Sequence, residues 1–163
     1  VLSLAVPVGQ RSPLYAGADS RMLLGSFDTD ASSRYISSIE MKQYASNTIL
    51  SKPDLCEVVE KSREIDLAIS MNEFQQGSAC ISVPVRDFSQ KIIAVLSVAF
   101  SEKKAVSAVL AKYAEVMKNA ACDISAVLGY RGGRDRTGVN YLKCCGDMEK
   151  MLKKIYSNRD FGR

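Results

Sequence analysis

The sequence of 163 residues contains no histidine and no tryptophan. Without histidine, catalysis by a Ser-His or Cys-His pair and metal sites with histidine ligands are excluded. The five cysteines form no Cys-x-x-Cys pair, so the usual spacing of thiolate metal sites is missing too. No signal peptide and no apolar run of membrane-spanning length is present. These absences exclude many of the mechanisms that hydrolases use. We expect a cytoplasmic protein that does not contact a membrane and that has no catalytic residue, metal or cofactor.

Charge is spread unevenly along the chain. Residues 131–163 hold nine basic and four acidic residues, which gives +5, whereas residues 1–130 hold 13 basic and 14 acidic residues, which gives −1. A basic tail can bind nucleic acid or a membrane surface, but the solvated face of a helix has the same composition, and we adopt that second interpretation. With 47% hydrophobic and 25% charged residues, the chain has the composition of a globular domain.

Residues 77–99 carry the strongest structural signal. Two runs rich in β-branched residues flank the polar connector Asp87–Gln90, whose length is typical of a β-hairpin. Because side chains alternate between faces with period two, one face is aliphatic and the other carries Cys80, Ser82 and Ser97 among apolar neighbours. Such a face is typical of a small-molecule pocket, although half-buried residues bonded to nearby backbone would give the same pattern.

Helical periodicity predicts helices on both sides of the hairpin in the chain. They cover residues 14–24, 28–39, 51–64, 105–128 and 141–156, and each is marked by a capping residue or by apolar residues three and four positions apart. The helix 105–128 is expected to cover the aliphatic face of the hairpin. Short strands are expected at residues 2–8 and 67–69. Because a domain rarely begins inside a strand, we expect that an upstream part of the protein is missing from this chain.

Several segments follow one another in the order of a known family. They are Val8-Gly9 at the end of the first strand, RSPLYAGADSRMLL, Glu73 four residues before Gly77, CISVPVRD and IIAVLSV. Over about residues 1–130, this order resembles the C-terminal effector-binding domain of the IclR family of bacterial transcriptional regulators. The resemblance implies an α/β (α+β), GAF-like domain with an antiparallel sheet. A long C-terminal helix would cover one face of this sheet, and a ligand pocket would lie on the other.

The resemblance also implies a function. The domain would sense a small effector, often a carboxylic acid, and would form homodimers or homotetramers, while DNA would be bound only by an N-terminal winged helix-turn-helix that this chain lacks. Residues 1–130 would be the effector-binding domain, truncated at its N-terminus, and residues 131–163 a basic, glycine-interrupted, helical extension. The residues expected to contact the effector, from family positions and from the polar face of the hairpin, are Gly17, Ala18, Glu73, Cys80, Ser82, Ser97 and Ala99.

The sequence departs from the family pattern in the predicted pocket. Asp19 places an acid near the expected ligand, where it would repel a carboxylate unless Arg21 or a backbone amide offsets its charge. Ala99 stands where many relatives have a serine. These differences bear on the identity of the ligand rather than on the fold, because the apolar pattern is intact.

Two other classes of function stay open. A GAF-like thiol redox enzyme would use Cys80, but no resolving cysteine lies at close spacing. A ligand-free dimerisation module would contact a partner or DNA with the basic tail. In a homo-oligomer, contacts between copies are expected from the helix 105–128 or from the tail. The segment Gly133–Gly138 resembles the end of the phosphate loop of tyrosine phosphatases, but Tyr130 stands where the nucleophilic cysteine would be, so we interpret it as a connector.

Overall fold

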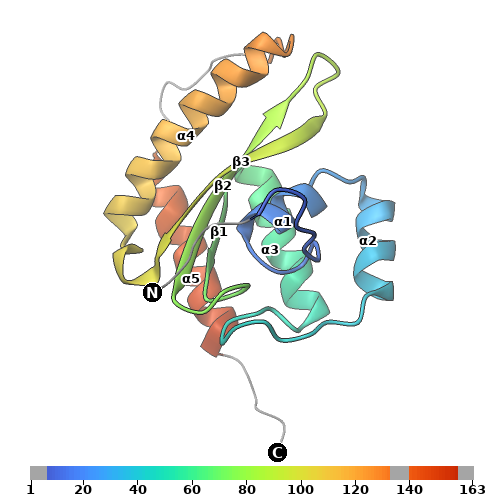
Figure 1. Cartoon of the computed structure of the whole chain (residues 1–163), viewed down its shortest axis with the longest axis vertical. Helices are drawn as coiled ribbons and strands as arrows, with labels where there is room; N and C mark the ends of the chain where they lie inside the picture. Colours follow the sequence, from blue (N-terminus) through green and yellow to red (C-terminus); the bar gives the residue numbers. More distant parts are fainter. Residues whose placement is uncertain (1–6, 133–139, 158–163) are drawn as a thin grey trace, which may run out of the picture.

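The structure is a computed structural model that describes residues 7–132 and 140–157. Its elements are α1 (Ala18–Leu24), α2 (Thr29–Ser38), α3 (Lys52–Ile65), β1 (Ala68–Met71), β2 (Ser78–Arg86), β3 (Ile92–Ser101), the short 3-10 helix η1 (Glu102–Lys104), α4 (Ser107–Val127) and α5 (Tyr141–Ser157). The sheet lies in the middle of the molecule, with α4 and α5 on one side and α1 on the other (Figure 1). The helix α3 packs against α1, α2 and α5.

The sheet is antiparallel with the strand order β1-β2-β3. The predicted hairpin is confirmed as β2 and β3, and the strand expected near residues 67–69 is confirmed as β1. The register places Ser82 opposite Ser97 and Val83 opposite Leu96. Residues that are opposite each other share a face, so the two predicted faces of the hairpin are those that the fold uses.

The helix α4 covers the aliphatic face of the hairpin, as the sequence predicts. Its apolar side chains Leu110 and Met117 belong to the same buried core as Ile81 and Val83 of β2. Three of these four side chains have no solvent exposure, and Met117 has 4%. This side of the sheet is therefore the main hydrophobic core, and its burial supplies most of the driving force for folding.

Local capping explains where two of the helices begin. The carboxylate of Asp28 accepts a hydrogen bond from the backbone N–H of Ala31 at 2.7 Å, which caps α2. The hydroxyl of Ser51 accepts one from the N–H of Asp54 at 3.3 Å, which caps α3. A side-chain cap satisfies an N–H group that has no partner within the helix, so both predicted starts are confirmed.

The helix predicted over residues 14–24 is wrong in its first part, because α1 begins only at Ala18. Gly17 has φ 96° and ψ 159°, a backbone conformation outside the helical region that favours glycine. The N–H groups of Gly17 and Ala18 donate to the side chains of Glu73 and Ser70, at 3.3 and 3.1 Å. Tertiary hydrogen bonds therefore take the place of a further helical turn.

The predicted C-terminal helix is confirmed as α5. Its buried side chains belong to the same core as the sheet, and they are Cys145, Met148, Leu152 and Ile155. Most of the predicted strand at residues 2–8, and the segment Gly133–Gly138, lie outside the described residues. Within the described part of the chain, none of the helices combines the length and apolar character that a membrane span needs.

Candidate ligand site

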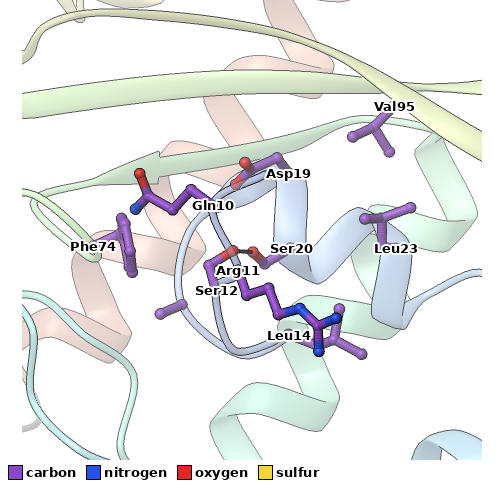
Figure 2. Close-up of a pocket in the computed structure, with 10 residues that line it drawn as sticks. Gln10, Arg11, Ser12, Leu14, Asp19, Ser20, Leu23, Phe74 and Val95 are labelled. Carbon is purple, nitrogen blue, oxygen red and sulfur yellow. Dashed lines mark hydrogen bonds between the residues drawn. The ribbon is translucent and has the colours of Figure 1, made fainter. Parts of the chain in front are cut away.

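A cavity of about 470 Å³ lies between the loop that precedes α1, α1 itself and the edge of the sheet (Figure 2). Sites for small molecules have volumes of roughly 300–1,000 Å³, so the cavity has room for a metabolite. Its walls are formed by Gln10, Arg11, Ser12, Leu14, Ala16, Asp19, Ser20, Leu23, Phe74 and Val95.

The walls of the cavity combine apolar surface with a few polar groups. Two hydroxyls, Ser12 Oγ and Ser20 Oγ, are hydrogen-bonded at 3.1 Å. The carboxylate of Asp19 and the guanidinium of Arg11 point to different sides of the cavity (Figure 2). A ligand there would meet a positive charge on one side and a negative charge on another. Charged and polar points of this kind orient a ligand against an apolar wall.

The seven residues predicted as ligand contacts lie beside this cavity rather than in its wall. Gly17 and Ala18 start α1, Glu73 precedes Phe74, and the others are on the sheet face under α1, namely Cys80, Ser82, Ser97 and Ala99. Their contact with a ligand stays a prediction. The link between the two groups is Val95, which lines the cavity and, like Cys80, packs against the buried cluster of Ala18, Met22 and Ala68.

The small polar groups on this sheet face are bonded to one another. Ser82 Oγ lies 2.8 Å from Ser97 Oγ and 3.7 Å from the sulfur of Cys80. Ser82 is fully buried, whereas Ser97 and Ala99 are exposed. Ala18 is fully buried above them. The half of the face under α1 is therefore filled by protein, and the half near Ser97 is open to solvent.

Burial controls the chemistry of Cys80. Loss of solvent raises the pKa of its thiol to about 11, and the negative charge of Asp19 acts in the same direction. The hydrogen bond with Ser82 and the charge of Arg21 oppose the shift without cancelling it. The thiol is therefore protonated at neutral pH, and the thiolate is the reactive form of cysteine.

A buried ion pair that the sequence analysis missed lies behind α1. Arg21 Nη1 pairs with Glu73 Oε2, and both side chains have no exposure. Arg21 Nη2 also donates to the carbonyl of Ile69 at 2.5 Å. The hydroxyl of Tyr156 donates to Glu73 Oε1 at 2.5 Å. The network therefore joins α1, the loop between β1 and β2, and α5, which are distant in the chain.

The ion pair also changes the expected role of Arg21. Burial lowers the pKa of Arg21, while the charges of Tyr156, Asp19 and Cys80 raise it. Asp19 is thus an electrostatic neighbour, but the ionic partner of Arg21 is Glu73. The arginine that lines the cavity is Arg11, which sequence reasoning passed over. The only signal for it was a charged residue in the loop just before the small-residue helix.

Within the residues that the structure describes, no group of three cysteine, aspartate or glutamate side chains could hold a metal ion. Arg11 and Asp19 of the cavity suit hydrogen bonds and ion pairs to an organic ligand instead.

Comparisons with known proteins agree on one family. Residues 1–126 match the family described as "Bacterial transcriptional regulator IclR C-terminal". The HTH-type transcriptional regulator KdgR of Escherichia coli (strain K12) is 33% identical over 123 residues, which are 76% of this chain and 47% of KdgR. The HTH-type transcriptional regulator KipR of Bacillus subtilis (strain 168) is 30% identical over 127 residues, 78% of this chain and 51% of KipR.

A solved structure shows the same similarity in three dimensions. The crystal structure of the C-terminal domain of E. coli KdgR has a TM-score of 0.70 and 34% sequence identity to this chain. The similarity covers 75% of this chain and 74% of that domain. The chain spans about half the length of the curated relatives that it matches.

Proposed function

Because the chain belongs to the bacterial transcriptional regulator IclR C-terminal family, we propose that it is the effector-sensing and oligomerisation domain of an IclR-type DNA-binding regulator. The observation that carries this proposal is the cavity of about 470 Å³ on the α1 side of the sheet, opposite the main core. A ligand can enter there without disturbing the packing of α4 and α5. The regulator acts in the cytoplasm as a homodimer or homotetramer, and DNA is bound by a separate module.

The effector is a small organic acid. Its carboxylate pairs with the guanidinium of Arg11, and its apolar part lies against Leu23, Phe74 and Val95. Asp19 on the other side of the cavity disfavours a second carboxylate there and favours a hydroxyl or ammonium group. The effector is therefore a monocarboxylic acid with a hydrogen-bond donor at its far end.

The predicted contact residues form the inner end of the site. Val95 belongs both to the cavity and to the small cluster with Ala18 and Cys80, so a ligand that extends past Asp19 approaches the polar sheet face there. Ser97, which is exposed, can then hydrogen-bond the ligand. In this arrangement Gly17, Ala18 and Glu73 act mainly by holding α1 in place.

The domain is not an enzyme. The matched relatives are named as transcriptional regulators. The raised pKa of Cys80 also argues against the thiol redox alternative, since only a small fraction of the thiol is ionised near pH 7. A ligand-free dimerisation module has no use for the cavity and is the less favoured alternative.

The proposal is tested by a thermal-shift screen of the chain with small carboxylic, hydroxycarboxylic, amino and aromatic acids. A ligand that binds only the folded state raises the melting temperature in a concentration-dependent way. We expect Arg11→Ala to weaken binding of the active acid by about 1.5–3 kcal/mol, the range for hydrogen bonds to charged groups. Asp19→Asn should weaken binding of an acid that carries a hydroxyl or ammonium group at its far end, because that group loses its charged acceptor.

Matched variants separate the two parts of the site. Arg34→Ala removes an exposed arginine of α2 outside the cavity and should leave binding unchanged. Ser97→Val tests the sheet face independently of Arg11. If no acid stabilises the chain, effector sensing is contradicted. If an acid binds equally well to Arg11→Ala and Ser97→Val, the site lies elsewhere.

A further inference from the structure

The helix α4 carries a second apolar stripe besides the one that faces the sheet. The first stripe is buried in the core and includes Leu110, Ala114, Met117 and Ala121. The second, which we name the outer stripe, repeats at spacings of three and four residues and consists of Val109, Tyr113, Val116, Ala120, Ile124 and Val127. Such spacing places side chains along one side of a helix.

The outer stripe is open to solvent over its second half. Val116 is 58% exposed, Ile124 is 42% exposed and Val127 is 88% exposed. The helix α5 packs on another side of α4, which is marked by Lys118, whose ammonium lies 5.6 Å from the ring centroid of Tyr141. Figure 1 shows α4 along the outside of the molecule. A contiguous apolar surface of this kind is typical of an interaction site.

Two opposite charges border the outer stripe on the same edge. Lys112 and Asp123 are exposed and lie 11 residues apart, which is about three helical turns. Neither takes part in an ion pair among residues 7–132 and 140–157. The midpoint between the two charges lies between Met117 and Lys118. The outer stripe runs from residue 109 to residue 127, so its midpoint lies at residue 118.

Because these two midpoints nearly coincide, the outer stripe and its charges are complementary to the same surface on a second copy. When two copies of α4 pack antiparallel about that midpoint, residues on one edge of each stripe meet, so Lys112 of each copy faces Asp123 of the other. Near the centre, Val116 of each copy meets the small side chain of Ala120 of the other. Parallel packing would instead place the two charged edges on opposite sides of the contact, so neither charge would gain an opposite charge from the other copy.

We propose that the outer stripe of α4 binds the outer stripe of a second copy of this chain in antiparallel orientation, with Lys112 opposite Asp123 of the other copy. The inference deepens the oligomerisation part of the proposed function and rests on it. It is independent of the ligand site, because α4 and the cavity lie on opposite sides of the sheet.

Charge reversal tests the orientation. The mass of the full chain is measured by sedimentation at high micromolar concentration for the wild type, Lys112→Glu, Asp123→Lys and the double variant. Each single reversal turns two attractive pairs into repulsive ones and should weaken self-association about 10-fold. The double variant restores opposite charges and should recover it. Glu57→Lys, a reversal of an exposed charge on α3 rather than on α4, should have no effect.

A second variant tests the apolar surface. Val116→Asp places a charge at the centre of the outer stripe and should lower the measured mass by half, while circular dichroism confirms that the chain folds. If the wild type assembles and its measured mass is changed neither by Val116→Asp nor by either single charge reversal, the proposed interface is contradicted, while oligomerisation itself is not. If the single reversals weaken self-association and the double variant does not restore it, the antiparallel arrangement is contradicted. A monomeric wild type overturns oligomerisation itself, whereas effector sensing is judged separately by the thermal shift.

Discussion

Glu73 joins α1, the loop between β1 and β2, and α5, which are distant from one another in the chain. Its carboxylate accepts hydrogen bonds from Gly17 N and from the partly buried Tyr156 Oη, and it pairs with the fully buried Arg21. The arrangement satisfies a buried negative charge and a buried positive charge together. Removing one partner leaves the other charge without compensation, which costs more than the pair itself contributes.

We therefore expect Glu73→Gln to lower the free energy of unfolding by about 3–5 kcal/mol. Tyr156→Phe, which removes one hydrogen bond to the same carboxylate, should cost less, about 1.5–3 kcal/mol. Urea denaturation of both variants at neutral pH measures the two values. A smaller loss for Glu73→Gln than for Tyr156→Phe would show that Arg21 finds another partner.

Cys80 should be slow to react with thiol reagents. Its pKa of about 11 leaves little thiolate at neutral pH, and the thiolate fraction rises only as the pH approaches that value. Iodoacetamide at neutral pH should therefore label Cys56, which is exposed, before Cys80. Peptide mass spectrometry gives the order of labelling. Rapid modification of Cys80 near pH 7 would revive the redox alternative.

At the scale of secondary structure, α5 is the element whose role the structure changes most. It lies outside residues 1–126, the part that matches the family, yet it packs on the same core as the sheet. Its Tyr156 also reaches Glu73 next to the cavity. Apolar burial and this hydrogen bond fix the helix to the domain.

Leu152→Ala should lower the free energy of unfolding by about 2–5 kcal/mol, because Leu152 has no solvent exposure and its loss leaves a cavity. The control is Leu142→Ala on the same helix. Leu142 is 56% exposed, so its replacement should change stability by no more than about 0.5 kcal/mol. Chemical denaturation measures both. Equal effects would mean that α5 is not docked as described.

The contact between α4 and α5 should weaken in acid. Partial burial raises the pKa of Glu149, but hydrogen bonds from Lys153 and Ser107 and the charge of Lys153 lower it more, so the pKa lies below its ordinary value of 4.5. A carboxyl group whose pKa is lower in the folded state stabilises the fold above the unfolded-state pKa. That contribution is lost as the pH falls through the folded-state value.

Unfolding followed from pH 7 down to pH values below 4.5 should therefore show a loss of stability that is smaller in Glu149→Gln, which has no carboxyl group to titrate. Ser107→Ala should reduce the same effect in part, because it removes the hydrogen bond of 2.5 Å to Glu149 Oε2. The same acid dependence in all three proteins would contradict the assignment.

At the scale of the whole molecule, the chain should have no sequence-specific affinity for DNA. The exposed lysines of α5, such as Lys143, Lys150 and Lys154, can attract phosphates without reading bases. Binding in a gel-shift assay should therefore be weak, equal for unrelated sequences and abolished by salt. A tight complex with one sequence that survives high salt would show that the chain itself recognises bases.

The sequence by itself determined the local structure. The hairpin, its two faces, the caps at Asp28 and Ser51 and the long amphipathic α4 follow from side-chain periods and hydrogen bonds that span only a few residues. The order of short motifs also identified the family, which the match over residues 1–126 confirms. These features could be predicted because each depends on neighbours in the chain.

Only the tertiary structure decided how α1 begins, which arginine lines the cavity and where α5 docks. The partners of Gly17 and Tyr156 are the same carboxylate of Glu73, at separations of 56 and 83 residues along the chain. No periodicity or cap encodes a pairing at such distances. Arg21 and Arg11 are alike in sequence, but one is buried against Glu73 and the other faces the cavity, because packing leaves space at only one of the two positions.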